Sequence, residues 1–153
     1  PLLRFATWVG GDMDGNPAVG AETIATTQHQ QRQRVLAAYI GDLEHLKAML
    51  TQSRTRVAFS AAFEARLEEY AARWPQALQY EDTPYRAFLG LVQARLTATR
   101  EDRLTGYPDA ASLDADLALV EDSLLGSRGE HAGVCALRRV RRRVAAFGFH
   151  LAA

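Results

Sequence analysis

Apolar side chains recur every three or four residues through most of the chain after residue 20, which is the period of an α-helix. The first run predicts a helix over residues 21–50, with Glu22 in its first turn, where the helix dipole favours negative charge. A second run predicts a helix over residues 60–74, which Pro75 ends because proline cannot continue the hydrogen-bond ladder. The apolar positions of the first run are Leu36, Tyr39, Ile40, Leu43, Leu46 and Leu50, and those of the second are Phe63, Leu67, Tyr70 and Trp74.

Two further helices follow a proline and a turn. "DTPYRAFLGLVQARL" predicts a helix whose free amides Thr83 caps and whose first position Pro84 occupies. "GYPDAAS", over residues 106–112, predicts a turn, and the fourth helix begins after it and closes at Gly126. The apolar positions are Tyr85, Phe88, Leu89, Val92 and Leu96 in the third helix, and Leu113, Leu117, Val120 and Leu124 in the fourth.

A fifth helix is predicted over residues 130–147, with Gly148 as its stop. "LRFATWV" and "FGFHLAA", at the two ends, lack the helical period and are predicted to be extended. The predicted fold class is therefore mainly α with a short strand near each end. Residues 1–20 form a strand and a glycine-rich loop, residues 21–147 form helices, and residues 148–153 start a strand.

Composition narrows the class of protein. The 153 residues are 48% hydrophobic and 24% charged, which is enough for one domain with a core. Eighteen basic and eighteen acidic side chains cancel, so no overall field draws the chain to nucleic acid or to an anionic membrane. No apolar run approaches the about 18 residues of a membrane span. A lone cysteine, Cys135, makes no internal disulfide, which indicates a cytoplasmic location, and the missing initiator methionine indicates a piece of a longer chain.

The opening stretch "WVGGDMDGNP" concentrates glycines and carboxylates. Asp12, Asp14 and Asn16 alternate like the first ligands of an EF-hand, but Pro17 and Thr23 stand where that motif needs glycine and glutamate. The stretch matches neither a dinucleotide fingerprint nor a P-loop. What remains is a junction between a strand and a helix. Its glycines let the backbone approach a ligand, and its Asp and Asn side chains hold the loop through bonds to the backbone.

A family resemblance gives this junction a function. "FATWVGGDMDGNPAV" resembles the F-G-S-W-x-G-G-D-R-D-G-N-P-x-V signature of phosphoenolpyruvate carboxylase. "TPYRAFLGLVQARLTAT" and "LRRVRRRVAAFGFHLA" are similar to two later segments of that family, in the same order and at similar separations. The resemblance covers essentially the whole chain. It implies an internal segment of a larger enzyme, in which these helices belong to an α/β-barrel protein.

The resemblance also implies a reaction, in which a lyase fixes carbon dioxide by converting phosphoenolpyruvate and bicarbonate to oxaloacetate and phosphate. It implies magnesium or manganese and an allosteric homo-oligomer. The family's histidine motif and metal carboxylates match nothing in these 153 residues, so the metal ligands and the catalytic groups are expected outside this chain, and the piece alone is expected to be inactive. His29, His45, His131 and His150 fall in no matching motif.

What this chain is expected to supply is one wall of the substrate pocket. By resemblance, Trp8 lines the apolar side beside the methylene of the enolate, and the loop shapes the pocket at the carboxyl end of a barrel strand. The family's arginine between the two aspartates is replaced by Met13, so no role is carried over for residue 13. Arg4 is the nearest replacement cation. The pocket residues of the loop are Gly10, Gly11, Asp12, Asp14, Gly15 and Asn16.

The sequence "LRRVRRRV" leaves an alternative open. Its arginines predict a site for a phosphorylated or acidic effector, or else a solvated helix face near a C-terminus, where the dipole favours cations. A freestanding helical binding or scaffold module is the alternative to the carboxylase. Nucleic acid is disfavoured, because aromatic residues do not interleave the arginines and the net charge is zero. The candidate effector residues are Arg138, Arg139, Arg142 and Arg143.

Overall fold

The computed structural model describes residues 20–127 and 131–150, and within them the chain is helical. The elements are α1 (Ala21–Met49), α2 (Ala61–Arg73), the short 3-10 helix η1 (Pro75–Ala77), α3 (Pro84–Arg100), α4 (Ala110–Gly126) and α5 (Val134–Phe147). All five predicted helices are present. None of the helices in these ranges is long and apolar enough to cross a membrane.

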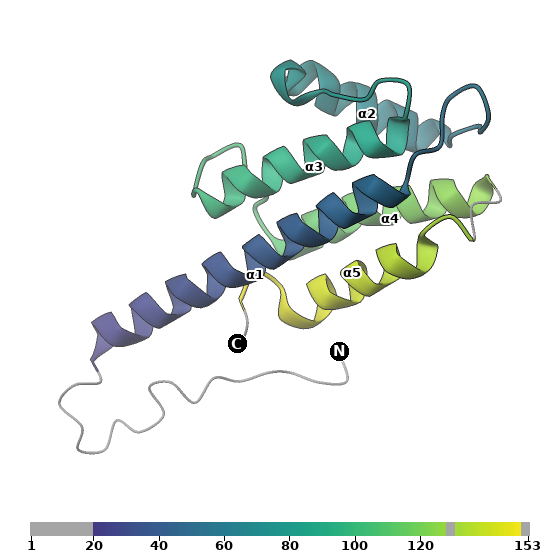
Figure 1. The fold of residues 1–153 in the computed structure, drawn as a ribbon. Coiled ribbons are helices and arrows are strands. Elements are labelled where there is room, and N and C mark those ends of the chain that lie inside the picture. Colours follow the sequence, from purple (N-terminus) through teal and green to yellow (C-terminus); the bar gives the residue numbers. More distant parts are fainter. Residues whose placement is uncertain (1–19, 128–130, 151–153) are drawn as a thin grey trace.

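α1 runs between α3 and α5 in Figure 1. α1 packs along α3 on one side and α5 on the other, and α4 pairs with α5. α2 lies across α3 and α4. The first turns of α1 extend beyond its neighbours, so this helix projects from one end of the bundle (Figure 1).

The predicted apolar faces form one continuous core. On α1 the side chains of Leu36, Tyr39, Leu43 and Leu46 are buried, and partly buried Ile40 packs against them. Aromatic rings join α2 to α3: the ring of Phe63 lies 4.9 Å from that of Tyr85 and 5.3 Å from that of Phe88, between centroids. Aromatic rings in contact prefer certain relative orientations, so these pairs stabilise the packing of α2 on α3 beyond the burial of apolar area. The helical period therefore identified most of the large apolar residues of this core, although it missed Val35, Leu91, Tyr107 and Phe149.

The ends of several helices differ from the prediction, because the period of apolar residues does not show which side chain caps a helix. The prediction that Thr83 caps α3 is wrong, because its hydroxyl donates to the carbonyl of Tyr80 instead. α4 begins at Ala110, inside the predicted turn, because Asp109 caps it by accepting a hydrogen bond of 2.7 Å from the amide of Ser112. α5 begins at Val134, later than predicted.

The C-terminal end of α5 follows the prediction in one respect and differs in another. Gly148 ends the helix as predicted, at a φ of 56°, which glycine adopts without strain. Residues 148–150 then form a turn, in which the amide of His150 donates to the carbonyl of Phe147. A strand does not begin at Gly148. The strands predicted for residues 1–19 and 151–153 lie outside the described residues and stay predictions.

Candidate functional site

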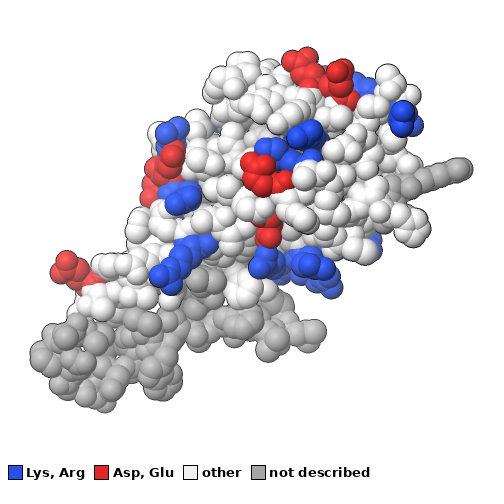
Figure 2. All heavy atoms as spheres, viewed as in Figure 1, with Lys and Arg blue, Asp and Glu red and all other residues white. Residues whose placement is uncertain are grey.

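The sequence predicted two sets of site residues, one in the opening loop and one in the arginine-rich segment, and the structure describes only the second set. Trp8, Gly10, Gly11, Asp12, Asp14, Gly15 and Asn16 lie outside the described residues. The arginines of the second set lie on α5, whose apolar stripe of Val134, Leu137, Val140 and Val144 is buried in the bundle. The arginines occupy the remaining faces of that helix. Figure 2 shows basic and acidic side chains interspersed over the visible face of the molecule.

Arg141, which was not among the predicted residues, is the centre of the arginine cluster. Its guanidinium donates to both carboxylate oxygens of Asp114, at 2.8 and 3.0 Å, and to Glu121 Oε2 at 2.7 Å. Asp114 and Glu121 lie two turns apart on α4, so one planar guanidinium reaches both of them. The hydrogen bonds to Asp114 raise the pKa of Arg141 above its ordinary value.

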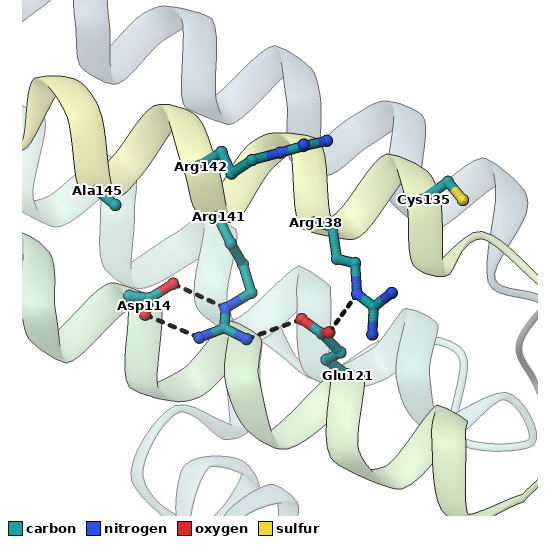
Figure 3. Close-up of a pocket in the computed structure, with 7 residues that line it drawn as sticks. All are labelled: Asp114, Glu121, Cys135, Arg138, Arg141, Arg142 and Ala145. Carbon is teal, nitrogen blue, oxygen red and sulfur yellow. Dashed lines mark hydrogen bonds and ion pairs between the residues drawn. The ribbon is translucent and has the colours of Figure 1, made fainter. Parts of the chain in front are cut away.

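Arg138 adds a second bond to the same carboxylate, with its Nε 2.5 Å from Glu121 Oε1 (Figure 3). The Glu121 side chain is only 9% exposed. Burial alone would raise the pKa of Glu121, but the hydrogen bonds from Arg138 and Arg141 outweigh it and lower that pKa below its ordinary value. These contacts join α4 to α5 as a charged, hydrogen-bonded network.

The remaining predicted arginines divide into two kinds. Arg143 binds both oxygens of Asp42 on α1, at 2.7 and 2.5 Å. Arg139 and Arg142 are exposed, and among the described residues neither has an ion-pair partner. Figure 3 shows the Arg142 side chain directed away from Asp114 and Glu121.

The candidate effector set is therefore smaller than the sequence suggested. All four arginines are exposed, as the interpretation of a solvated helix face has it, but Arg138 and Arg143 are also paired with carboxylates of other helices. The seven-residue spacing of Asp114 and Glu121 places both carboxylates on one face of α4, but it does not specify the helix that packs there. Arg139 and Arg142 are the cations that remain available.

An open groove of about 550 Å³ lies between α4 and α5 (Figure 3). Its floor carries the paired charges of Asp114, Glu121, Arg138 and Arg141, and Arg142 lines its side. Two carboxylates offset two guanidinium groups there, which leaves Arg142 as the charge without a partner. Cys135 and Ala145 complete the lining of the groove.

A second polar cluster, which the sequence reasoning missed, is centred on Asp116 of α4. Asp116 is 1% exposed, and its Oδ2 accepts hydrogen bonds of 2.6 Å from the hydroxyl groups of Tyr70 and Tyr107. Nη1 of Arg66 lies 3.3 Å from Oδ1, and Nη1 of Arg95 lies 3.7 Å from Oδ2. Arg95 also donates to the Tyr70 hydroxyl.

This cluster ties α2, α3 and α4 together at one buried carboxylate. Burial raises the pKa of Tyr107 well above 10.0, and burial together with the bond to Asp116 raises that of Tyr70, so both phenols remain donors. A signal was present in the sequence, because Asp116 follows Leu113 by three residues on the apolar stripe of its helix. A charge on such a stripe needs partners from its neighbours.

The resemblance implies a divalent cation, which needs a group of oxygen or nitrogen ligands. In the described ranges no three His, Cys, Asp or Glu side chains gather in a way that could hold a metal ion. The buried carboxylate of Asp116 is surrounded by cations and hydroxyl groups, which suits a carboxylate and opposes a metal. The described residues therefore do not fit magnesium or manganese.

The geometry shows a helical bundle with ion pairs at two buried carboxylates, Asp116 and Glu121. Comparison with known proteins gives the family. The profile of the family described as phosphoenolpyruvate carboxylase matches residues 1–153. The chain belongs to the phosphoenolpyruvate carboxylase family.

Curated relatives bear the same name. A phosphoenolpyruvate carboxylase of Xanthomonas campestris pv. campestris (strain 8004) is 50% identical over 156 residues, which cover 99% of this chain and 17% of the relative. Those of Azorhizobium caulinodans and Ralstonia nicotianae are each 36% identical, over 99% of this chain and 18% and 16% of the relatives. The chain thus spans less than a fifth of the length of these relatives.

Proposed function

We propose that this chain is part of an enzyme that converts phosphoenolpyruvate and bicarbonate to oxaloacetate and phosphate. The observation that carries the proposal is the family match over residues 1–153. The relatives named for this activity are about six times longer, since the chain covers 17% of them. We therefore prefer a segment of a carboxylase to the freestanding helical binding or scaffold module.

In the proposed reaction the phosphoryl group passes from phosphoenolpyruvate to bicarbonate, which yields carboxyphosphate and the enolate of pyruvate. The methylene carbon of the enolate then forms a bond to the carboxyl carbon, and phosphate leaves. A proton that reaches the enolate first would give pyruvate instead, so the pocket must exclude water. A divalent cation bound elsewhere in the whole enzyme would stabilise the negative oxygens.

The part proposed for this chain is water exclusion and shaping of the pocket. The indole of Trp8 supplies an apolar surface beside the methylene carbon. The glycines of the loop let its backbone approach the substrate, while its polar side chains hold the loop in shape. These residues are Gly10, Gly11, Asp12, Asp14, Gly15 and Asn16.

The helical bundle supports this proposal as an anchor. α1 begins at Ala21, five residues after Asn16, and α3 and α5 pack along it. The Tyr39 hydroxyl of α1 donates to the carbonyl groups of Arg143 and Gly148, at 3.2 and 2.8 Å. The loop would therefore lead into a helix that is anchored to its neighbours from Arg32 onward, while the first turns of that helix project from the bundle.

Regulation, assembly and location are part of the proposal. We propose a cytoplasmic homo-oligomer in which Arg139 and Arg142 bind a phosphorylated or acidic effector. These two arginines are exposed and lack an ion-pair partner within the described ranges, and their three-residue spacing on α5 puts them on adjacent faces. Double replacement by glutamine in the full-length enzyme should abolish the response to such an effector, and Arg138→Gln should preserve it.

The activity is tested with the full-length enzyme and the isolated 153-residue piece side by side. With labelled bicarbonate and magnesium present, the full-length enzyme should incorporate label into oxaloacetate. The piece should incorporate none above a heat-killed control, because the metal ligands and the catalytic groups are proposed to lie in the rest of the enzyme. Labelled oxaloacetate from the piece, or none from the full-length enzyme, would contradict the proposal.

A further inference from the structure

The most exposed large apolar side chain in the described part of the molecule lies at the tip of a loop. Leu104, between α3 and α4, has a relative exposure of 104%, whereas the other exposed large apolar side chains, Met49, Tyr80 and Leu125, range from 37% to 43%. Single exposed leucines are common on protein surfaces, so exposure alone decides nothing. What distinguishes Leu104 is the backbone that presents it.

The loop over residues 101–106 is held by hydrogen bonds on both sides of Leu104. The amide of Arg103 donates to the carbonyl of Ala98 at 2.9 Å, and the amide of Gly106 donates to the carbonyl of Arg103 at 3.0 Å. The amide of Tyr107 donates to the hydroxyl of Thr99 at 2.6 Å, within the buried core. These hydrogen bonds restrict the conformations of the loop, so few of them could bury the Leu104 side chain against the bundle.

Three further features fix the same loop. Arg32 of α1 donates to the carbonyl of Thr99 at 2.9 Å and to Asp102 Oδ1 at 3.0 Å. Gly106 lies so close to α3 that an added Cβ would meet the backbone of Thr99 at 2.7 Å. Asp102 has a φ of 53°, a left-handed conformation that costs a residue other than glycine free energy. The loop that carries Leu104 is therefore held closely against α1 and α3.

The position of the loop indicates what covers Leu104. α1 begins, α3 ends and α5 ends at the same end of the bundle (Figure 1). The contacts agree, since Arg32 of α1 reaches the loop and Tyr39 reaches the end of α5 at Gly148. The chain enters and leaves the described bundle at this end, and it covers only 17% of its relatives.

We propose that the loop over residues 101–106 is a docking tip, and that Leu104 inserts into an apolar recess on another part of the same carboxylase chain. The charged neighbours in the loop suit the rim of such a contact. Arg103 pairs with Glu101 at 2.7 Å and Asp102 pairs with Arg32, so the rim is polar and largely neutral around one apolar residue. Protein interfaces commonly have this arrangement of an apolar centre and a polar rim.

The test uses Leu104→Cys in the full-length enzyme, labelled with N-ethylmaleimide and followed by mass spectrometry of the peptide that contains position 104. The peptide readout makes the result independent of Cys135 and of other cysteines. The reference is the labelling rate of the same variant unfolded in urea. We expect labelling of the native enzyme to be slower than this reference by about tenfold or more, because a covered thiol reacts only when the contact opens.

Two results would overturn the proposal. Labelling of the native enzyme at nearly the rate of the unfolded chain would show that Leu104 is uncovered. Protection that disappears on dilution, in step with loss of the oligomer by light scattering, would show that a second copy covers it and not the same chain. Leu104→Cys removes no contact within the bundle, so the variant should fold. Because the readout does not need turnover, failure here is distinct from failure of the proposed activity.

Discussion

The hydroxyl of Tyr107 donates a 2.6 Å hydrogen bond to Oδ2 of Asp116, and both side chains are buried. The tyrosine lies in the loop before α4 and the aspartate in the second turn of that helix, nine residues later. Their contact fixes the path by which the chain leaves α3 and enters α4. It also gives a buried negative charge a donor that burial itself keeps protonated.

Removal of the buried charge should destabilise the bundle. Asp116→Asn keeps the shape of the side chain but leaves Arg95 without a carboxylate and Arg66 with Glu69 alone, and the new amide nitrogen would face other hydrogen-bond donors. Breaking a buried pair on one side costs about 3 kcal/mol. Urea unfolding of the full-length enzyme, followed by a probe on these helices, measures the loss. Asp122→Asn, on the exposed side of α4, is the matched control and should change stability little.

The buried phenols predict a loss of stability at high pH. The pKa of Tyr107 is raised in the folded protein above its ordinary 10.0, so between these values the folded state holds a proton that the unfolded state has released. The stabilisation is complete below pH 10 and decreases as the pH rises above it. Tyr107→Phe should lower stability at neutral pH by about 1 to 2 kcal/mol and make the alkaline decline shallower. An unchanged slope above pH 10 in this variant would contradict the assignment.

The two neighbouring arginines of α5 should behave differently. Arg141→Gln leaves the buried Glu121 with Arg138 alone and Asp114 unpaired, so it should cost about 1 to 2 kcal/mol, less than a fully buried pair because the site is partly exposed. Arg142→Gln should stay within about 0.5 kcal/mol of the parent. Chemical denaturation of both variants is the measurement. Equal losses in the free energy of unfolding would contradict the view that Arg141 stabilises the bundle through Asp114 and Glu121 while Arg142 does not.

The proposed role of Trp8 predicts a change in product. Trp8→Ala in the full-length enzyme should admit water to the apolar side of the pocket, so more enolate is protonated to pyruvate and the ratio of oxaloacetate to pyruvate falls. Separate coupled assays for the two products give this ratio. Trp74→Phe, a change in the helical core at a buried ring, controls for general loss of packing and should preserve the ratio. An unchanged ratio in Trp8→Ala would make Trp8 a packing residue.

Met13 stands where the family motif has arginine, and this difference predicts the order in which substitutions in the loop reduce activity. Met13→Arg in the full-length enzyme should alter substrate binding only modestly, since a solvated ion pair between arginine and aspartate is typically worth about 0 to 1 kcal/mol. Asp12→Ala and Asn16→Ala should reduce turnover more, because we propose that the side chains of Asp12 and Asn16 hold the glycine-rich backbone in shape. Steady-state kinetics of the three variants gives the order. If Met13→Arg abolished turnover while Asp12→Ala left turnover unchanged, the predicted order would be wrong.

Features that depend on neighbours in sequence were accessible without a structure. The period of apolar residues predicted five helices and their buried faces, because burial of one face of a helix leaves a repeat of three and four residues. Gly148 as the end of α5 was equally readable, since a single residue type favours that conformation. The family was readable too, from the run "FATWVGGDMDGNPAV", which the match over the whole chain confirms.

The tertiary structure alone decided which charges meet. Adjacent arginines have opposite roles, because Arg141 faces α4 and binds Asp114 and Glu121, whereas Arg142 faces away. Asp116 likewise acquires its tyrosines and arginines from α2, α3 and the loop between α3 and α4. A local sequence sets the face of a helix on which a charge lies, but its partner is set by the packing of another helix. That packing is a property of the whole core, since side chains far apart in sequence must fill the same space.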